Sequence, residues 1–500
     1  MNGVEPVSTF YDNQRERVGA ALRGDPLLRN LLIGSGAIAL GLGSGAAVTF
    51  GPFWAGFAAL AALAAGYALL RSTSAGIAAI VLIATVLPFG TLPFKAVVTP
   101  NFLELALLAV LGIWLLRVLV QPSATLHLSA LGLPVIGFLG LTLFSFILGS
   151  NASPDSLLLH NYFKFVLAVL FFFTMINCVL SRAQARFVLR CLVIGGALSA
   201  AIGLLLFALP NGVAERLLVS LGRIGYPTEG RVLRFVNDEL LGVERAIGLS
   251  VDPNSYGGML ALVGALATTL AVAERAILPR WFMVGCAGVI ALVTLLTQSR
   301  GALGGLAAGV VFVAVVRYRR LLWPLAGAAL LGAVLYLVFG IGAAFVTRIV
   351  DGIQFRDLAN QMRLAEYRNA IAVIQAYPVF GIGFGAAPEL DLVAGVSSIY
   401  LAIAQRIGLA GLFAFLAIVG VWFVRTQRAL RSADATGDIE RGVWLLALQS
   451  AIVAALAVGL LDHYFFNIEF SHMVALFWGT IGLGMALEGQ ADGQQEQAAS

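Results

Sequence analysis

Residues 187–209 read FVLRCLVIGGALSAAIGLLLFAL, an apolar run whose one charged side chain is Arg190. The hydrocarbon core of a bilayer is about 30 Å thick, and an α-helix needs about 20 apolar residues to cross it. Inside hydrocarbon every backbone N–H and C=O group must be satisfied within the membrane-spanning structure, and a run of this length meets that need as a helix. The run therefore predicts a transmembrane helix.

Runs of this kind follow one another from Leu31 to Gly489. Hydrophobic residues make up 60% of the sequence and charged residues 11%, against roughly 45–50% and about 25% in soluble proteins. Alternating apolar–polar segments of about ten residues, the pattern of membrane barrels, do not occur. The sequence predicts an all-α fold, a polytopic integral membrane bundle of about 14 transmembrane helices with two long extracytoplasmic loops. The predicted spans lie near residues 31–49, 52–70, 75–92, 102–120, 129–149, 161–180, 187–209, 255–273, 281–298, 302–316, 321–345, 397–424, 443–461 and 470–487.

The arginines between these spans are distributed unevenly. Cytoplasmic segments carry an excess of Lys and Arg, and this bias sets the orientation of a membrane protein. The short segments of one side contain only Lys95 and Arg300. Those of the other side contain Arg15, Arg17, Arg23, Arg29, Arg71, Arg117, Arg182, Arg186, Arg190, Arg275, Arg280, Arg317, Arg319, Arg320, Arg425, Arg428, Arg431 and Arg441. Both termini are therefore predicted to be cytoplasmic.

This orientation divides the chain into seven parts. We expect a cytoplasmic N-terminal segment (1–30), N-terminal helices (31–209), a first extracytoplasmic loop (210–254), central helices (255–345), a second extracytoplasmic loop (346–395), C-terminal helices (396–487) and a disordered tail (488–500). The net charge of +5 reflects arginines at helix ends rather than a basic patch, so no nucleic-acid partner is expected. Three cysteines, Cys178, Cys191 and Cys286, lie inside apolar runs, which predicts packing residues rather than disulfides or a metal site.

The two long loops contain many arginines on the side where they are not expected by default. They are Arg216, Arg223, Arg231, Arg234 and Arg245 in the first loop, and Arg348, Arg356, Arg363 and Arg368 in the second. Neighbouring acids such as Glu215, Glu244 and Asp351 allow a solvated, salt-bridged surface. For the whole set we favour an anionic ligand, because the planar guanidinium binds phosphate oxygens with two parallel hydrogen bonds and stays charged.

Four local patterns within and beside these loops are candidate functional segments. Asp252-Pro253-Asn254 precedes a span and predicts a helix cap. Gln298-Ser299-Arg300-Gly301 is a short turn that holds Arg300 either as an interfacial anchor or facing a membrane-borne substrate. Residues 363–378 predict an amphipathic helix with an apolar stripe of Leu364, Tyr367, Ile371 and Ile374, in which Arg363 can pair with Glu366. Gly381-Ile-Gly383-Phe-Gly385 predicts a tight turn rather than a nucleotide-binding loop.

The order of these motifs resembles the O-antigen ligase and polymerase superfamily of bacterial polysaccharide assembly. The matching pieces are Arg245-x-x-Gly248 with Asp252-Pro253-Asn254, Ser299-Arg300-Gly301, Arg363-x-x-x-Tyr367 with Tyr377-Pro378-Val-Phe-Gly381-Ile-Gly383-Phe-Gly385, and Ser398-Ile-Tyr400-Leu401 with Arg406-Ile-Gly408-Leu-Ala-Gly411. This resemblance implies glycosyl transfer at the outer face of the bacterial inner membrane. The donor would be an oligosaccharide on undecaprenyl pyrophosphate, with no metal and no cofactor. Arg300, Arg363 and Arg245 would stabilise the pyrophosphate leaving group.

One position departs from the family pattern. The ligases usually carry a His-Asn pair before the Tyr-Leu, with the histidine as the base for the acceptor hydroxyl, whereas this chain has Ser397 and Ser398. Serine has no useful basicity near neutral pH, so the base must come from elsewhere. The candidates for it are Asp252, Glu366, Glu389, Asp391 and His463. We further predict substrate-binding roles for Arg368, Tyr367, Asn254 and Tyr400, which lie in the same segments.

The missing histidine favours a polymerase of O-antigen or exopolysaccharide repeat units over the alternative, a ligase that moves finished glycan to lipid A core or another acceptor. An alternative of another class is a flippase of lipid-linked sugars. Transporters usually show internal repeats and broken helices, and no clear repeat is found between the halves of this chain. The expected partners are the lipid-linked oligosaccharide, the bilayer and a chain-length regulator.

Overall fold

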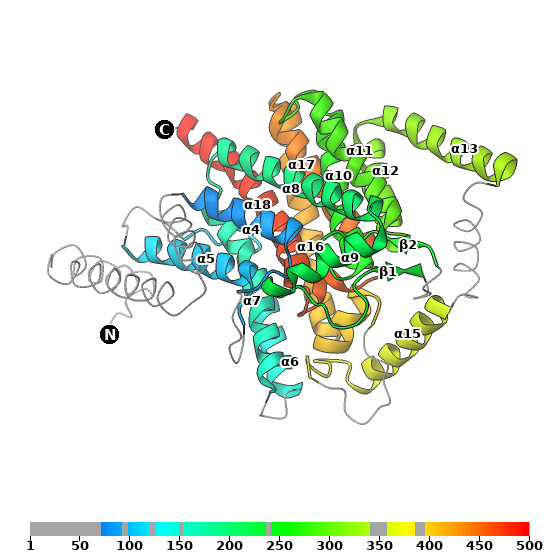
Figure 1. The fold of residues 1–500 in the computed structure, drawn as a ribbon. Coiled ribbons are helices and arrows are strands. Elements are labelled where there is room, and N and C mark those ends of the chain that lie inside the picture. The colour runs from blue at the N-terminus through cyan, green and yellow to red at the C-terminus, as the bar shows by residue number, and fades with distance from the viewer. Residues whose placement is uncertain are drawn as a thin grey trace, which may run out of the picture.

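The computed structural model describes residues 72–92, 99–120, 126–149, 154–236, 242–340, 358–385 and 396–499 (Figure 1). The predicted segment 1–30 and the predicted spans 31–49 and 52–70 lie outside these residues. The all-α prediction is confirmed, since the described chain is helical apart from one ribbon of two short strands. The α-helices are α4 (Thr73–Val86), α5 (Phe102–Val120), α6 (Gly132–Gly149), α7 (Ser156–Cys178), α8 (Arg182–Ala208), α9 (Asn211–Ser220), α10 (Pro253–Val272), α11 (Arg280–Leu296), α12 (Arg300–Val316), α13 (Leu322–Phe339), α15 (Leu358–Ala376), α16 (Ile399–Ala435), α17 (Ile439–Val458) and α18 (Ser471–Ala499).

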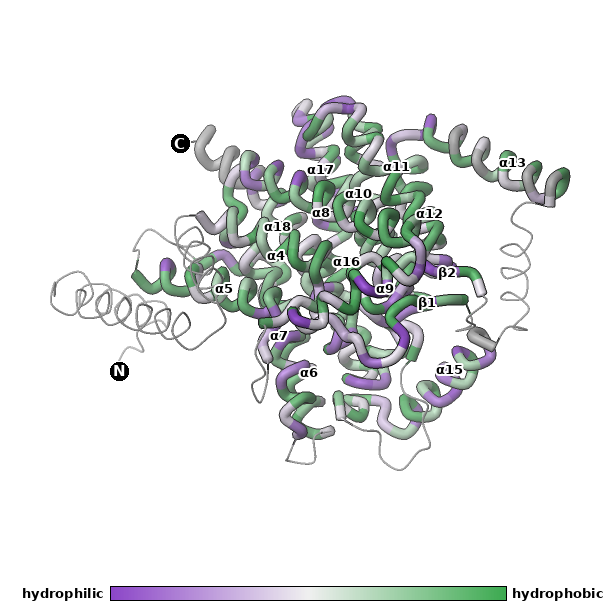
Figure 2. Tube along the Cα trace, viewed as in Figure 1, coloured by the Kyte–Doolittle hydropathy of each residue, from purple (hydrophilic) through white to green (hydrophobic). Residues whose placement is uncertain are grey.

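Eight helical segments of the described chain are long and apolar enough to cross a bilayer. They are α5, α6, α7, α8, α10, α16, α17 and the segment Arg319–Val338, which combines the 3-10 helix η3 (Arg319–Leu321) with most of α13. Three shorter apolar helices, α4, α11 and α12, accompany them. Figure 2 shows hydrophobic residues along these helices and hydrophilic residues at their ends and along α15. The protein is therefore a multi-pass membrane protein.

Helices α10 and α17 form the centre of the bundle. In their most apolar windows 89% and 83% of the residues are buried. Helix α12 packs closely against α17 because Gly305 and Gly309 leave room for the Val458 side chain and for the backbone carbonyls of Ala454 and Ser450. Small residues at such crossings let helix backbones approach inside a membrane. The hydroxyls of Thr269 and Ser450 share a buried hydrogen bond of 2.9 Å between α10 and α17.

The segments predicted to be cytoplasmic lie together at one end of the bundle. Four ion pairs join them: Arg182 with Asp438, Arg186 with Glu440, Arg317 with Asp434, and Arg425 with Glu488. The opposite ends of the same helices carry the two loops predicted to be extracytoplasmic. The first contains α9, the 3-10 helix η1 (Leu221–Ile224) and the antiparallel strands β1 (Arg234–Phe235) and β2 (Glu244–Arg245). The second contains α15, which begins before the predicted amphipathic helix (363–378) and ends two residues earlier than predicted, at Ala376.

Two expectations differ from the structure, one about the buried face of α15 and one about the C-terminal tail. In α15 the fully buried side chains are Ala370 and Val373, whereas Ile371 of the predicted stripe is 47% exposed. The most buried face of α15 therefore includes Ala370 and Val373, while Tyr367 of the predicted stripe also faces the protein and shares its hydroxyl proton between the Ser397 and Leu460 carbonyls. Helix α18 continues to Ala499, through residues expected to form a disordered tail. These residues are rich in Ala, Gln and Glu, which favour helix.

The glycine turn at residues 381–385 docks against a break in helix α16. Gly381 and Gly383 have φ values of 65° and 76°, as the predicted tight turn requires. The break lies at Ile407 and Gly408, where Gly408 has φ 72°. Backbone groups of the turn satisfy the freed groups of the helix: Leu409 N–H donates to the Pro378 carbonyl and Gly383 N–H to the Arg406 carbonyl. Helix α16 is therefore broken, and the glycine turn supplies the backbone hydrogen bonds that the break leaves open.

Candidate functional site

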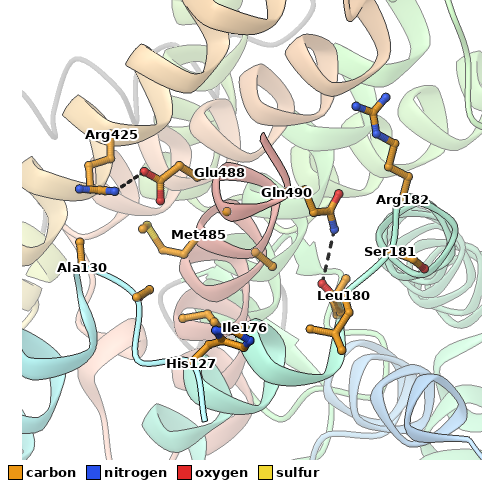
Figure 3. Close-up of a pocket in the computed structure, with 14 residues that line it drawn as sticks. His127, Ala130, Ile176, Leu180, Ser181, Arg182, Arg425, Met485, Glu488 and Gln490 are labelled. Carbon is orange, nitrogen blue, oxygen red and sulfur yellow. Dashed lines mark hydrogen bonds and ion pairs between the residues drawn. The ribbon is translucent and has the colours of Figure 1, made fainter. Parts of the chain in front are cut away.

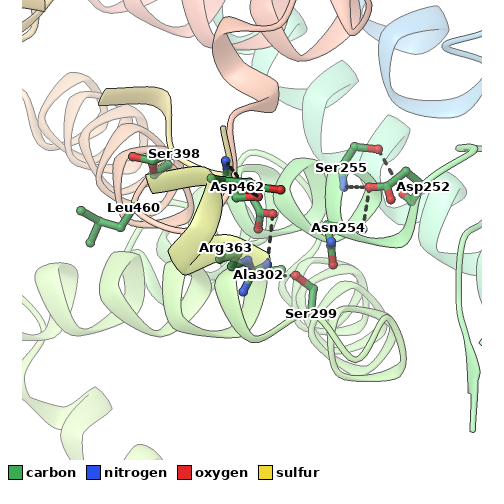
Figure 4. Close-up of polar contacts among 12 residues, drawn as sticks. Asp252, Asn254, Ser255, Ser299, Ala302, Arg363, Ser398, Leu460 and Asp462 are labelled. Carbon is green, nitrogen blue, oxygen red and sulfur yellow. Dashed lines mark hydrogen bonds and ion pairs between the residues drawn. The ribbon is translucent and has the colours of Figure 1, made fainter. Parts of the chain in front are cut away.

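A buried carboxylate, Asp462, lies where α12, α15 and α17 meet (Figure 4). Helix α17 ends at Val458, and the Asp462 N–H donates to the Val458 carbonyl, which holds the residue just beyond the helix end. Asp462 is 4% exposed, and its Oδ2 has no hydrogen-bond partner among the described residues. A Cβ atom added to Gly301 would lie 2.6 Å from this oxygen, so any larger residue there would require the Asp462 side chain to move. The start of α12, which carries partial positive charge, therefore faces a carboxylate.

Arg363 approaches the other carboxylate oxygen from α15. Its Nη2 lies 3.7 Å from Asp462 Oδ1, which is an ion-pair distance and longer than a hydrogen bond. The Arg363 side chain is also 18% exposed, so part of it remains accessible to solvent beside the carboxylate. The pairing with Glu366 considered from the sequence is replaced by this contact with Asp462. Arg363 can therefore turn its planar fork toward an anion without breaking a hydrogen bond to Asp462.

Arg245 reaches the cluster from strand β2 of the first loop. Its Nε donates to the Thr297 carbonyl at 2.8 Å and its Nη2 to Asn254 Oδ1 at 2.5 Å. Gly248, three residues on, has φ 55°, and an added Cβ would strike the ring of Tyr256. The Arg-x-x-Gly spacing therefore allows the loop to turn onto α10. Burial lowers the pKa of Arg245, and the charges of Asp252 and Asp462 counteract this effect.

Asp252 caps α10, as predicted from the sequence. Its Oδ1 accepts hydrogen bonds from the N–H groups of Asn254 and Ser255 at 2.9 and 2.7 Å, with Pro253 in the first turn. The cap orients Asn254 toward Arg245. Tyr464 also makes a side-chain hydrogen bond with Asp252. The Asp252 carboxylate therefore links the start of α10 to Tyr464.

Asp252→Ala is expected to lower the free energy of unfolding by about 0.5–2 kcal/mol, because the alanine cannot accept the two helix N–H bonds. Asp252→Asn should retain most of the stability, since asparagine is also a good cap. Thermal unfolding of the purified protein in lipid nanodiscs measures both effects. Equal melting temperatures for the alanine variant and the wild type would contradict this role.

Glu366 and Tyr367 connect α15 to the chain on either side of the cluster. Glu366 Oε2 accepts from the Ser397 N–H at 3.0 Å and from its hydroxyl at 2.7 Å. The Tyr367 hydroxyl lies 2.9 Å from the Ser397 carbonyl oxygen and 3.1 Å from the Leu460 carbonyl oxygen, so its single proton is shared between them. Ser398 donates to the Gly459 carbonyl at 3.3 Å. Ser397 and Ser398, which stand where the family has its His-Asn pair, therefore fix the chain before α16 to α15 and to the end of α17.

Arg300 lies next to the cluster along the chain. It is the first residue of α12, after the cap Ser299, whose hydroxyl accepts from the Ala302 N–H, and before Gly301 at the Asp462 carboxylate. The structure has a short turn between α11 and α12 at residues 297–299, and Arg300 follows it as the first helical residue rather than lying within it. Gln298, two residues before it, has an unusual φ of 55°, which makes this turn tight.

The candidate bases differ in their protonation. Burial raises the pKa of Asp462 to about 7, although Arg363 and Arg245 lower it and Asp252 and Glu366 raise it further. Burial lowers the pKa of His463 to about 4, so its ring is the weaker base at neutral pH. Asp252 and Glu366 already accept hydrogen bonds, and Glu389 and Asp391 lie outside the described residues. Asp462 therefore combines an unpartnered oxygen with a pKa suited to general-base work.

The structure brings several predicted site residues together and separates others. Arg363 contacts Asp462, and Tyr367 donates to the Leu460 carbonyl two residues before it. Arg245 lies near enough for the Asp462 charge to act on it, and it holds Asn254. Arg368 is exposed on α15, and the Tyr400 hydroxyl donates to the Leu456 carbonyl on α17. The sequence analysis did not select Asp462 as a base. Its position between two predicted spans, beside His463, was the available signal.

Two cavities lie at opposite ends of the helices. The larger, about 590 Å³, is lined by Arg182, His127, Arg425 and Glu488 at the ion-paired end (Figure 3). Along α18, Ser471 and Glu488 are about 25 Å apart at 1.5 Å per residue, so this cavity lies far from Asp462. The smaller, about 420 Å³, includes His463 in its wall. No group of three His, Cys, Asp or Glu side chains able to hold a metal is found within the described ranges.

Residues 286–416 match the family model described as O-Antigen ligase. The resemblance to the O-antigen ligase and polymerase superfamily is therefore confirmed, and the matched range contains Arg300, Arg363 and Ser397. None of the curated proteins compared with the chain matches it. A chain from a structure of a peptidoglycan synthase complex is similar at 18% identity, over 72% of this chain and 97% of that one, with a TM-score of 0.41.

Proposed function

We propose that the protein is a polymerase of polysaccharide repeat units that transfers glycan from undecaprenyl pyrophosphate to a lipid-linked acceptor at the outer face of the inner membrane. The observation that carries this proposal is the convergence of Arg245 and Arg363 on the buried Asp462, beside the start of α12. Arginine side chains can bind an anionic leaving group, and a carboxylate with a pKa of about 7 can accept the proton of an attacking hydroxyl. The family match at residues 286–416 supports this type of activity.

In the proposed reaction an acceptor hydroxyl attacks the anomeric carbon of the donor sugar. A new glycosidic C–O bond forms while the bond from that carbon to the pyrophosphate oxygen breaks. The hydroxyl proton passes to the Asp462 carboxylate, and the electron pair of the broken bond stays on the pyrophosphate. Arg363, Arg245 and Arg300 stabilise this charge, because fixed cations are most effective where water is excluded.

The polymerase proposal is favoured over the ligase alternative by residues 397 and 398. Both serines hydrogen-bond within the protein, to Glu366 and to the Gly459 carbonyl, and neither can serve as the base of the ligase pattern. The transporter alternative gains some support from the break in α16. Its freed N–H groups are satisfied by carbonyls of residues 378 and 379, however, so the break anchors the second loop.

Gel analysis of glycans from a strain lacking the protein tests the proposal. We expect single repeat units on the lipid carrier or on their final acceptor, with no polymer. Full-length polymer retained on its lipid carrier would establish the ligase instead. Repeat units confined to the cytoplasmic face would establish the transporter, and normal polymer would exclude all three functions.

A further inference from the structure

The cavity of about 420 Å³ has a wall chemistry that differs from the Asp462 cluster. It lies between the start of α7, the start of α16 and residues 463–469, and we call it the His463 cavity. Its volume falls within the roughly 300–1,000 Å³ that is typical of ligand pockets. His463 follows Asp462 directly in the chain, and the charge of Asp252 acts on its ring, so this part of the wall lies near the cluster, although Asp462 itself does not line the cavity. The leaving-group residues Arg363, Arg245 and Arg300 do not line it.

Three amide side chains, Asn161, Gln405 and Asn467, line the His463 cavity. An amide offers both a donor and an acceptor, which matches a hydroxyl group that can do the same. His463 also lines the cavity, and its Nδ1 is buried without a partner among the described residues. Burial lowers the pKa of His463 to about 4, which keeps the ring neutral at neutral pH. These groups suit a ligand rich in hydroxyls.

The charged residues of the wall disfavour an anion. Arg406 is the one cation that lines the cavity, and its Nη1 donates to the carbonyls of Gly383 and Gly385 at 3.2 and 3.0 Å. Two carboxylates, Asp155 and Glu469, also line the cavity. A pyrophosphate would meet this excess of negative charge, whereas a neutral sugar accepts hydrogen bonds from the arginine and donates to the carboxylates.

Two aromatic rings complete the wall. Phe384 and Phe466 line the cavity, and their ring centroids lie 6.1 Å apart. Phe384 comes from the glycine turn and Phe466 from the 3-10 helix η4 (Tyr464–Phe466). An apolar surface beside hydrogen-bonding groups fits a sugar ring, which has an apolar C–H face and hydroxyls at its edge.

We infer that the His463 cavity is a saccharide-binding subsite that holds the acceptor sugar, with its reactive hydroxyl directed toward Asp462. The inference rests on the proposed function for the identity of that sugar as acceptor. It assigns the two substrates to different chemistry: the pyrophosphate of the donor to the arginines, and the acceptor sugar to the amides, His463 and the aromatic rings.

Binding measurements on the full-length protein in lipid nanodiscs test this assignment. The first probe is the oligosaccharide repeat unit released by hydrolysis of the parent strain's polymer, and the second is inorganic pyrophosphate. We expect Gln405→Ala and Asn161→Ala each to raise the Kd for the oligosaccharide at least tenfold and to leave pyrophosphate binding unchanged. Both positions are helical, where alanine is well tolerated, and the Gln405 carbonyl that Ile382 N–H donates to is kept.

The control is Gln427→Ala, an amide on the far part of α16 and outside the cavity, which should bind both probes as the wild type does. Oligosaccharide binding that is absent in the wild type, or equal in both cavity variants and the wild type, would overturn the inference. Arg363→Ala should weaken pyrophosphate binding and retain oligosaccharide binding. Failure of that last result alone would count against the proposed leaving-group site and leave the saccharide assignment standing.

Discussion

Arg363→Ala is expected to lower the rate of polymer formation by about two to three orders of magnitude, comparable to the loss of one oxyanion-hole donor in other enzymes. Arg363 is the cation that lies against Asp462 while making no hydrogen bond to it, so its donors are available to a leaving pyrophosphate. Arg363→Lys should recover little activity, because a point charge cannot reproduce the bidentate fork. Gel analysis of polymer from the complemented deletion strain measures the effect.

The matched control is Arg428→Ala, which removes an exposed arginine of α16 near the ion-paired end. It should support normal polymer. Membrane levels of all variants, measured by immunoblot, separate lost activity from lost protein. Wild-type polymer from both Arg363 variants at normal protein level would contradict the proposed site.

Asp462→Asn is expected to reduce transfer by about 10²–10⁴-fold, the range that general acid–base catalysis contributes. The folded-state pKa of about 7 means that the carboxylate is protonated at lower pH and cannot accept a proton. Wild-type activity should therefore rise as pH increases through about 7 and level off above it. The asparagine variant should lose this pH dependence, and Asp462→Glu should partly restore both the rate and the pH profile.

A structural role for Asp462 predicts a different result in a double variant. If the carboxylate only holds Arg363, its protonation would release Arg363 and give a similar pH profile. The discriminating variant is therefore Asp462→Asn combined with Arg363→Ala: a rate below that of Arg363→Ala alone supports the base, and an equal rate supports the structural role. The control Glu215→Gln changes an exposed acid of α9 and should alter neither rate nor profile. Rates at several pH values in proteoliposomes distinguish these outcomes.

Stability should respond to the same ionisation in the opposite direction. The pKa of Asp462 is raised from an ordinary value of 3.8 to about 7 by burial, so the unfolded chain releases this proton first as pH rises. Between these two values the unfolded state gains stability relative to the folded one. Asp462 therefore favours function near neutral pH at some expense of stability.

Much of the local structure could be predicted from short stretches of sequence. The cap at Asp252, the positive φ at Gly381 and Gly383 and the turn before Arg300 all depend on residues within one or two turns of each other. Capping oxygens, glycine's conformational freedom and hydropathy act over such distances. The apolar face of α15 was assigned to Ile371 instead of Ala370 and Val373, because helical spacing alone does not show which face meets a neighbour.

By itself, the sequence determined that the chain is a helical membrane protein and that arginines gather in the two long polar segments. These properties follow from transfer free energies and from the chemistry of single side chains. The tertiary structure alone decided that Asp462 lies between Arg363 and Gly301, and that Glu366 pairs with Ser397 rather than Arg363. Such contacts join residues far apart in the chain, so they depend on how the helices pack and not on any local pattern.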